Sequence, residues 1–285
     1  MKTLISLVSL ALLATGSMPA SAALIAYFPF EADFNDASGS NNHATGRGTA
    51  GAITINTASP AAVGSGSVAF DNGVTGGGGN VLSVNNTTGG LNLSGMPVFT
   101  LSIWLLSTAN QTDRRIFAEA SSTSTNPLYT LGTGTIRATV PTSSNEQFNF
   151  YRRTSGGAVT NNHEVSPESP FETGTWQNAV WIDQSGAVDL YLNGTYSRSN
   201  TYTDSDLAVN TTSFGGVLRA AGLAGFTGQL DDIGIWNEAP TNPAAFARAI
   251  ASGMAANTVA ITIPEPATGA LSLLAIAGLA MRRRR

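Results

Sequence analysis

Acidic side chains placed close together are the feature of this 285-residue sequence that could do hydrolytic chemistry. A glycosidase needs two carboxyl groups about 5–10 Å apart across the bond it cleaves. The candidate groups are Glu31-Ala32-Asp33 with Asp36, the acidic residues within Glu164–Glu172, and Asp231-Asp232. Asn35 indicates a turn inside the first group, and Pro167 and Pro170 break any strand through the second. The spacing therefore predicts no catalytic carboxylate pair, and we expect no enzymatic activity.

Histidine, serine and cysteine give no stronger catalytic signal. The sequence has no cysteine, which excludes disulfides, cysteine-ligated zinc and thiol catalysis, and it has no G-x-S-x-G elbow. His43 and His163 lie in the Asn-rich stretches NNHATG and NNHEVS, without a histidine partner at metal-ligand spacing. We interpret both as turn residues.

Asp231 occupies a position where a carboxylate is costly. Strict alternation through Leu230–Trp236 places Asp231 on the face of Ile233 and Ile235, which we expect to be the core face. A buried carboxylate needs a cation or hydrogen-bond donors. Two alternatives follow: a structural Ca²⁺ ion, which binds oxygen ligands, or backbone N–H groups.

Short strands must position these side chains. Val98–Leu105 alternates, with Phe99, Leu101, Ile103 and Leu105 on one face and Thr100, Ser102 and Trp104 on the other. Ala179–Asp183 and Ala187–Leu192 flank a turn at Gln184-Ser185-Gly186, and Asn193-Gly194 supplies a type I′ hairpin turn. Gln229–Asn237 is a late strand and Asn242–Ser252 a helix. This pattern predicts an all-β sandwich or jelly roll of two antiparallel sheets.

Several sequence blocks resemble, in order, the laminin-G-like, concanavalin A-like domains. They are AYFPFEADFNDASGSNNHATG (26–46), GSVAFDNG (66–73), FTLSIWL (99–105), TWQNAVWID (175–183), VDLYLNG (188–194) and GFTGQLDDIGIWNEA (225–239). The glycine-rich stretch GVTGGGGN (73–80) departs from the family pattern. The resemblance implies one concanavalin A-like jelly roll over residues 23–252, followed by a linker at 253–262.

The family resemblance also implies a metal site, and it provides a catalytic motif with which this sequence can be compared. It implies a calcium site at the sandwich edge, which would use Asp36 and Asp231, with carbonyl groups of Gly39–Asn42 as further ligands. The alternative is that Asp36 caps its own turn while Asp231 accepts backbone N–H groups. Laminarinase-like retaining glycosidases on this fold carry E-x-D-x-x-E on one strand, and here Asp36 stands in place of the second Glu.

Aromatic residues could bind a sugar. Trp104, Trp176, Trp181 and Trp236 all lie in the family-like blocks, where we expect them to pack the core. Tyr151-Arg152-Arg153 and Tyr202 are better candidates for ligand contact, although Arg152-Arg153 is equally compatible with a solvated pair. The sequence does not locate the ligand-binding site.

The N-terminus has the pattern of a signal peptide over residues 1–22. Lys2 precedes an apolar run, and Ala20-Ser21-Ala22 forms an A-x-A site for signal peptidase. We therefore expect export across the inner membrane.

The C-terminal segment 263–285 combines three signals. Pro264-Glu265-Pro266 precedes Ala267–Met281, 15 uncharged residues that as a helix would reach about 22 Å, less than the ~30 Å hydrocarbon core. Arg282, Arg283, Arg284 and Arg285 would hold their end in the cytoplasm. We expect a short transmembrane helix that anchors the protein transiently, and a simple tail anchor is the alternative.

This tail resembles the PEP-CTERM sorting signal of Gram-negative bacteria. The resemblance implies cleavage by an exosortase near the Pro-Glu-Pro motif, in a host that makes a biofilm or exopolysaccharide matrix. Between the two terminal signals, nine basic residues face 17 acidic ones, a net charge of about −8, so we expect no nucleic-acid partner. We expect an exported, non-catalytic surface or matrix protein that binds glycans or proteins. The alternatives are a polysaccharide hydrolase or lyase and a purely structural matrix protein.

Overall fold

The computed structural model describes residues 24–49, 51–73, 79–84, 90–109, 111, 113–133, 148–164, 172–184, 186–203, 207–220, 224–259 and 261. The expected signal peptide, the Pro-Glu-Pro motif and the C-terminal helix with its arginines lie outside these residues. Within the described part of the chain, no helix is long and apolar enough to cross a membrane.

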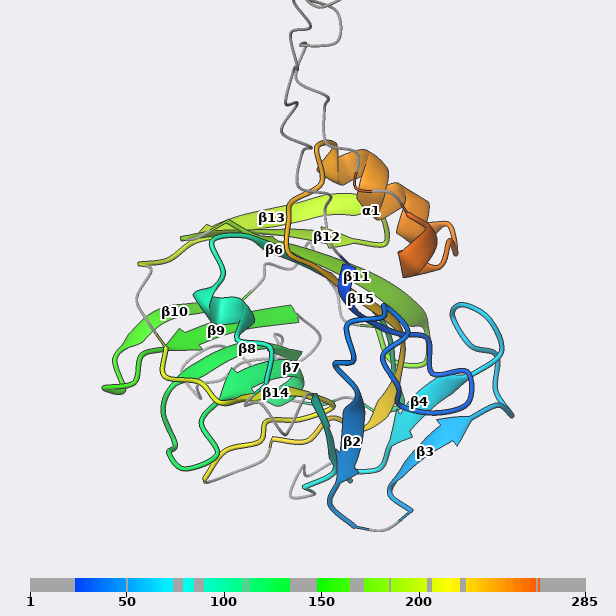
Figure 1. The fold of residues 1–285 in the computed structure, drawn as a ribbon, viewed down its shortest axis with the longest axis horizontal. Helices are drawn as coiled ribbons and strands as arrows, with labels where there is room; N and C mark the ends of the chain where they lie inside the picture. The colour runs from blue at the N-terminus through cyan, green and yellow to red at the C-terminus, as the bar shows by residue number, and fades with distance from the viewer. Residues whose placement is uncertain are drawn as a thin grey trace, which may run out of the picture. The chain divides into compact units, whose positions relative to one another are not determined.

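Two antiparallel sheets face each other, and both are drawn in Figure 1. The eight-stranded sheet has the order β13-β12-β11-β6-β15-β4-β3, and β1 pairs with the second half of β15. Its strands are β1 (Leu24–Phe28), β3 (Ile53–Asn56), β4 (Ser67–Phe70), β6 (Phe99–Ser107), β11 (Trp176–Asp183), β12 (Ala187–Leu192), β13 (Thr195–Thr201) and β15 (Gly228–Trp236).

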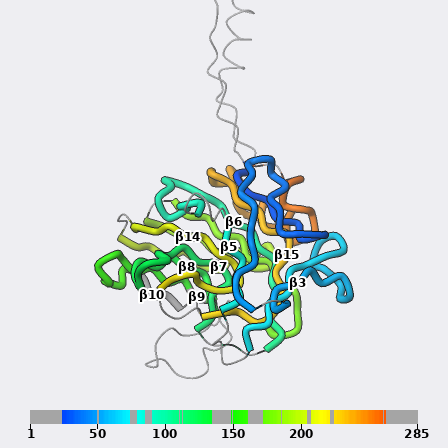
Figure 2. The backbone as a smooth tube through the Cα atoms, turned by 60° about the horizontal axis from the view of Figure 1, so that its bottom comes forward, coloured from blue at the N-terminus to red at the C-terminus, as the bar shows by residue number. Residues whose placement is uncertain are grey.

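The seven-stranded sheet has the order β10-β9-β8-β7-β14-β5-β2. Its strands are β2 (Ala44–Arg47), β5 (Val81–Val84), β7 (Arg114–Ala120), β8 (Leu128–Thr133), β9 (Phe148–Arg153), β10 (Val159–Glu164) and β14 (Thr211–Phe214). The prediction of an all-β jelly-roll sandwich is confirmed. β1, the first described strand, pairs with β15, the last one, so segments far apart in the sequence lie side by side in this sheet (Figures 1 and 2).

Aromatic side chains fill the space between the sheets. Ring contacts run from Phe28 through Phe214, Phe117 and Tyr129 to Phe150, with centroids 5.3–6.4 Å apart. Edge-on and tilted contacts of this kind add to the hydrophobic stabilisation of the burial itself. The predicted inward face of β6 is confirmed, because its members all belong to this core: Phe99, Leu101, Ile103 and Leu105.

The helix α1 (Pro243–Ala251) covers the outer face of the eight-stranded sheet, above β11–β13 in Figure 1. The side chain of Asn242 accepts a hydrogen bond from the N–H of Ala245 at 3.0 Å, and Pro243 follows at the first helical position. The Phe246 ring meets Trp236 edge-on, with centroids 5.1 Å apart. The helix expected over Asn242–Ser252 is therefore confirmed, with Asn242 as its N-cap and Ala251 as its last helical residue.

Two short 3₁₀ helices complete the described structure: η1 (Leu93–Gly95) and η3 (Ala256–Thr258). Ala256 and Val259 belong to the apolar cluster beneath α1. Part of the segment interpreted as a linker therefore packs against the sandwich.

Candidate functional site

Asp36 fixes the loop that follows β1. Its Oδ1 accepts hydrogen bonds from the N–H groups of Tyr27 and Ser38, both at 2.8 Å, and its Oδ2 accepts one from Asn42 at 2.9 Å. The Nδ1 atom of the exposed His43 accepts the N–H of Asp36 at 3.1 Å. The structure describes the turn role that was expected for His43 and was the alternative to calcium binding for Asp36.

Asp231 and Asp232 form a bulge in the middle of β15, where the register with β6 shifts between Asp231 and Gly234. Leu230 and Ile233 both point into the inter-sheet core, so the two residues between them are displaced from strict alternation. The expectation that Asp231 shares the face of Ile233 and Ile235 is wrong for this reason. Asp232 adopts a positive φ of 44° at the bulge.

The Asp231 and Asp232 carboxylates join three segments of the chain. Oδ2 of Asp231 accepts the N–H groups of Ala62 and Val63, both at 2.9 Å, and its Oδ1 accepts that of Asp232 at 2.7 Å. Asp232 accepts the Tyr27 hydroxyl at 2.7 Å and the N–H of Ala256 at 2.8 Å. The bulge therefore fastens β1, the 61–66 loop and η3 to β15.

Burial is the largest effect on the pKa of both aspartates. It raises the pKa of Asp231 to about 7, against the opposing effect of the backbone N–H groups, and the neighbouring Asp232 adds to the rise. Burial also raises the pKa of Asp232, and it raises that of the Tyr27 hydroxyl, which donates to Asp232. Both aspartates are buried, at most 1% exposed.

The expected calcium site has few ligands in this arrangement. No group of three or more His, Asp, Glu or Cys side chains in the described residues could hold a metal ion. The carboxylates of Asp36 and Asp231 are each directed at backbone N–H donors from separate segments. A calcium ion at these residues stays a prediction, and backbone carbonyl groups would have to supply most of its ligands.

The remaining candidate carboxylates do not lie on one strand. Glu31 and Asp33 sit in an exposed bend after β1. There Glu31 accepts the Ser65 hydroxyl at 2.6 Å, and Asp33 accepts the N–H of Asn35 at 2.9 Å. The Glu164–Glu172 candidates fall largely outside the residues whose side chains are described. His163 lies on β10, where it pairs with Phe150 of β9, so the expectation that it is a turn residue is wrong; its side chain is not among those described.

The tryptophans are mostly core residues, as expected. Trp104, Trp181 and Trp236 are at most 9% exposed. The half-buried Trp176 donates its Nε1–H to the carbonyl of Pro60 at 2.9 Å.

The proposed ligand-contact residues separate into inner and outer positions. Arg152 is fully buried, lies over the Tyr202 ring at 4.7 Å, and donates to the carbonyl of Thr203 at 2.9 Å. The Tyr202 hydroxyl donates to the buried Asp183 at 2.8 Å. Arg152 and Tyr202 thus belong to the interior, and the solvated-pair interpretation is wrong for Arg152. Tyr151 and Arg153 face outward from β9.

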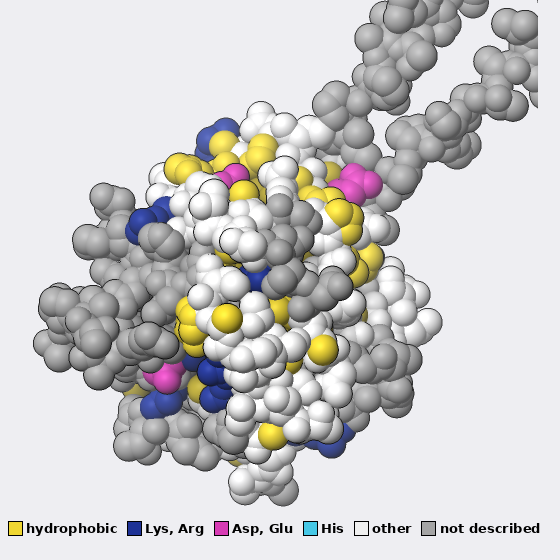
Figure 3. Space-filling model, turned by 90° about the vertical axis from the view of Figure 1, so that its left-hand side faces the viewer, with side chains coloured by type: hydrophobic (Ala, Val, Ile, Leu, Met, Phe, Trp, Pro, Cys, Tyr) yellow, Lys and Arg dark blue, Asp and Glu magenta, His cyan; other side chains and the backbone are white. Residues whose placement is uncertain are grey.

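A buried apolar cluster, bordered by arginines, lies on the outer side of the seven-stranded sheet. The cluster is Ala118, Ala120, Leu128, Tyr151 and Val217. Arg115 and Arg219 join Arg153 around it, and sequence reasoning missed both. The adjacent Arg114-Arg115 pair at the start of a strand was the one signal in the sequence. Figure 3 shows one face of the molecule on which basic side chains gather beside hydrophobic ones.

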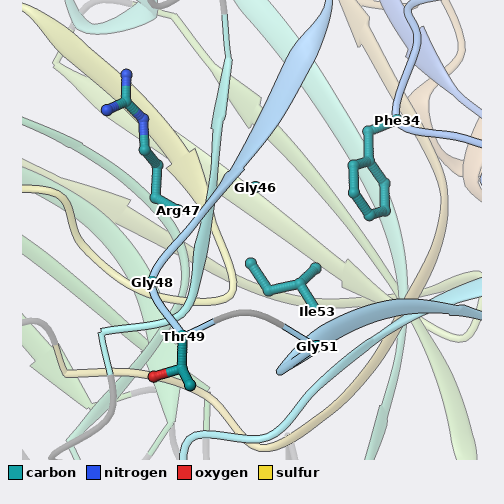
Figure 4. Close-up of a pocket in the computed structure, with 7 residues that line it drawn as sticks. All are labelled: Phe34, Gly46, Arg47, Gly48, Thr49, Gly51 and Ile53. Carbon is teal, nitrogen blue, oxygen red and sulfur yellow. The ribbon is translucent and has the colours of Figure 1, made fainter.

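A separate pocket of about 160 Å³ opens where the two edge strands β2 and β3 meet (Figure 4). Phe34 and Ile53 form its apolar wall beside Gly46. Arg47 and Thr49 supply its polar side chains, and both are exposed. Its volume is below the ~300–1,000 Å³ typical of small-molecule sites.

Comparisons with known proteins agree with this architecture. Residues 75–244 match the laminin G family model described as the concanavalin A-like lectin/glucanases superfamily. No curated protein matches the sequence significantly.

Among solved structures, domain 4 of AbnA, a GH43 extracellular arabinanase from Geobacillus stearothermophilus, in complex with arabinotriose, is similar with a TM-score of 0.60 and 18% identity. The similarity covers 81% of this chain and 99% of that one. The botulinum neurotoxin type G receptor-binding domain has a TM-score of 0.52 and 12% identity over 80% of this chain and 51% of its own. The binding domain of Paraclostridial Mosquitocidal Protein 1 has a TM-score of 0.52 and 14% identity over the same shares. The chain therefore spans about half the length of these toxin domains. At these identities the likeness shows a shared fold.

Proposed function

The chain belongs to the concanavalin A-like lectin/glucanases superfamily, and from this premise we propose that it is a non-catalytic glycan-binding protein of the cell surface or biofilm matrix. A protein ligand is the alternative on the same fold, since concanavalin A-like sandwiches also form toxin receptor-binding domains.

The observation that carries the proposal is the match to domain 4 of the arabinanase. That domain is known in complex with arabinotriose, and this chain covers 99% of it. Because that sandwich is known with a bound oligosaccharide, its similarity to this chain supports a glycan-binding role for this protein.

The use of the acidic side chains supports a binding role over an enzymatic one. Glu119, Asp183, Asp231 and Asp232 lie on strands and are at most 2% exposed. Glu119, for example, accepts the N–H groups of Leu93 and Ser94, both at 2.7 Å. A glycosidase needs its carboxyl pair to reach the substrate, and in the described strands these four are committed to internal hydrogen bonds.

The two ends of the sequence support export and sorting. In this proposal signal peptidase removes residues 1–22, and an exosortase cuts near Pro264-Glu265-Pro266 after the short helix has stopped in the membrane. Mass spectrometry of the exported protein tests the sorting: a protein that still carries Arg282–Arg285 would contradict it.

A glycan panel tests the proposed function. The purified protein is incubated with immobilised neutral and anionic polysaccharides, among them arabinan and the host's exopolysaccharide, and retention is measured. We expect retention on at least one glycan and no release of reducing ends from it. Released reducing ends would favour the hydrolase alternative, and an absence of retention on every glycan would favour the structural one.

A further inference from the structure

We propose that the solvent side of α1, with the side chains around the C-terminal end of this helix, binds a lipid membrane surface. We call this surface the α1 face, and it consists of Tyr196, Ala245, Arg248, Ala249 and Met254. The inference rests on the membrane-inserted tail of the proposed function, and it adds which side of the sandwich faces the lipid while that tail is in place.

The composition of α1 is unusual for a helix at a protein surface. Its buried side, which includes Phe246, packs against the sheet. The opposite side of a surface helix normally carries charged and polar residues. Here Arg248 is the one charged residue of the helix. The rest of its solvent side is alanine: Ala244, Ala245 and Ala249. A helix that is apolar on both sides favours a second apolar surface over water.

Exposed apolar side chains gather near the C-terminal end of α1. Among the described residues, three large apolar side chains are exposed: Val159, Tyr196 and Met254. Met254, 44% exposed, follows the last residue of α1 by three positions. Tyr196, 53% exposed, follows the hairpin turn that contacts α1, where a Cβ on Gly194 would be 3.1 Å from Cβ of Ala251. Two of the three therefore lie beside the helix, and tyrosine is enriched where protein meets lipid headgroups.

The C-terminal end of the described structure lies on the same side of the sandwich. Ile261 packs against the apolar cluster beneath α1, and Tyr191, whose ring contacts that of Tyr196, belongs to the same cluster. Ala256 donates its N–H to Oδ2 of Asp232 at 2.8 Å, which holds this last segment against β15. The chain therefore leaves the sandwich beside the α1 face.

The number of residues after Ile261 limits how far the sandwich could lie from an inserted tail. Five residues, 262–266, separate it from the uncharged run Ala267–Met281. Fully extended, they reach at most about 20 Å, whereas a sandwich of this size is about 45 Å across. A tail inserted in the membrane would therefore hold the α1 side of the sandwich at the lipid surface.

The distribution of charge favours the same side for an anionic bilayer. Between the terminal signals, nine basic residues face 17 acidic ones, so most of the body is repelled by anionic lipids. Arg248 gives the α1 face a positive charge, and the acidic residue nearest to α1 in the sequence, Glu238, is half-buried. One cation beside a tyrosine, a methionine and alanines suits shallow contact at the level of the headgroups.

The test uses the absence of cysteine from the sequence. Ala245→Cys and Met254→Cys each carry an environment-sensitive fluorophore on the α1 face, and Val159→Cys carries it at an exposed position of the other sheet. The chain is produced in a host without exosortase, so that it keeps its tail. It is reconstituted into vesicles of phosphatidylethanolamine and phosphatidylglycerol that contain a spin-labelled quencher lipid. Thermal melting confirms that each variant is folded, and flotation measures whether the protein is inserted.

We expect the probes on the α1 face to be quenched at least about twofold more strongly than the probe at the Val159 position. Arg248→Glu should weaken the quenching of the probe carried by Ala245→Cys, because it replaces the cation with a charge that anionic lipids repel. The matched control is Arg47→Glu, at an exposed position on β2, which should leave that quenching unchanged.

Floated protein with equal quenching of all three probes, or with none, would overturn the proposal. Disulfide-linked dimers of unlabelled Ala245→Cys would also overturn it, because a second copy of the chain would then cover the α1 face. Protein that does not float would refute the inserted tail and this inference together, and retention on glycans, measured separately, would be unaffected.

Discussion

Buried carboxylates join segments that the sheet pairing leaves apart. Glu119 accepts hydrogen bonds from the start of η1 and, at 2.9 Å, from the Thr212 hydroxyl. Asp36 gathers the loop after β1, and the Asp231-Asp232 bulge holds β1, η3 and the 61–66 loop. An apolar residue could not replace any of them, because the surrounding N–H groups would lose their acceptor.

The raised pKa of Asp231 predicts that the stability of the protein depends on pH. Its pKa is about 7 in the folded protein and close to 3.9 when unfolded, so the folded state binds the proton more tightly. Its contribution to stability is complete below about pH 4 and is lost as the pH rises through 7. Between pH 5 and 7.5 we expect the free energy of unfolding of the wild type to fall relative to that of Asp231→Asn, measured by denaturant titration.

The exposed Asp33 supplies the control for this experiment, since Asp33→Asn makes the same change in solvent. Asp33→Asn should follow the wild-type pH profile. Parallel profiles for the wild type and Asp231→Asn would contradict the raised pKa.

The calcium prediction is tested at Asp36. If Ca²⁺ binds there, EDTA should lower the Tm of the wild type, because a ligand that binds only the folded state stabilises it. The Asp36→Asn variant should show the same Tm in Ca²⁺ and in EDTA. Identical melting of the wild type in the two conditions would leave Asp36 and Asp231 as hydrogen-bond acceptors only.

At the scale of elements, the hairpin between β12 and β13 shows what local sequence determines. Asn193 and Gly194 have φ angles of 46° and 77°, as the type I′ prediction requires. The turn also supports α1: a Cβ on Gly194 would lie 3.0 Å from Cα of Arg248 and 3.1 Å from Cβ of Ala251.

Gly194→Ala should therefore destabilise the protein through both backbone strain and a clash with α1. The left-handed conformation alone costs about 1–2 kcal/mol. Gly39 has φ 90°, and no atom of the described residues lies within 4 Å of the place a Cβ would take, so Gly39→Ala measures the strain without the clash. We expect the larger loss of unfolding free energy for Gly194→Ala. Equal losses would mean that α1 does not rest on this turn.

Strands β6 and β15 show which side-chain orientations could be predicted from the sequence and which could not. Alternation correctly grouped the residues on one face of β6, because β6 pairs with β11 without a bulge and its side chains therefore alternate regularly. It failed at Asp231 because a bulge adds a residue, and nothing local in LDDIGIW marks that insertion. The N–H groups of Ala62 and Val63, which satisfy Asp231, lie about 170 residues away in sequence.

At the scale of the whole molecule, the fold was predictable and the grouping of the basic side chains was not. Strand patterns and the family-like blocks indicated a jelly roll, since these depend on neighbouring residues. The grouping of Arg115, Arg153 and Arg219 depends on strand order: Arg115 and Arg153 lie on the two strands that flank β8, opposite Gly132 and Leu128, and Arg219 comes from the segment after β14. The net charge gave no sign of this grouping, because an acidic total says nothing of where the few arginines lie.

The most direct test of the central claim, non-catalytic glycan binding, is retention of the purified full-length protein on immobilised polysaccharides, with the released sugar assayed in the same samples. The account predicts retention on at least one glycan, with the polymer left intact. Cleavage of the retaining polymer, or failure to bind any glycan in the panel, would contradict it.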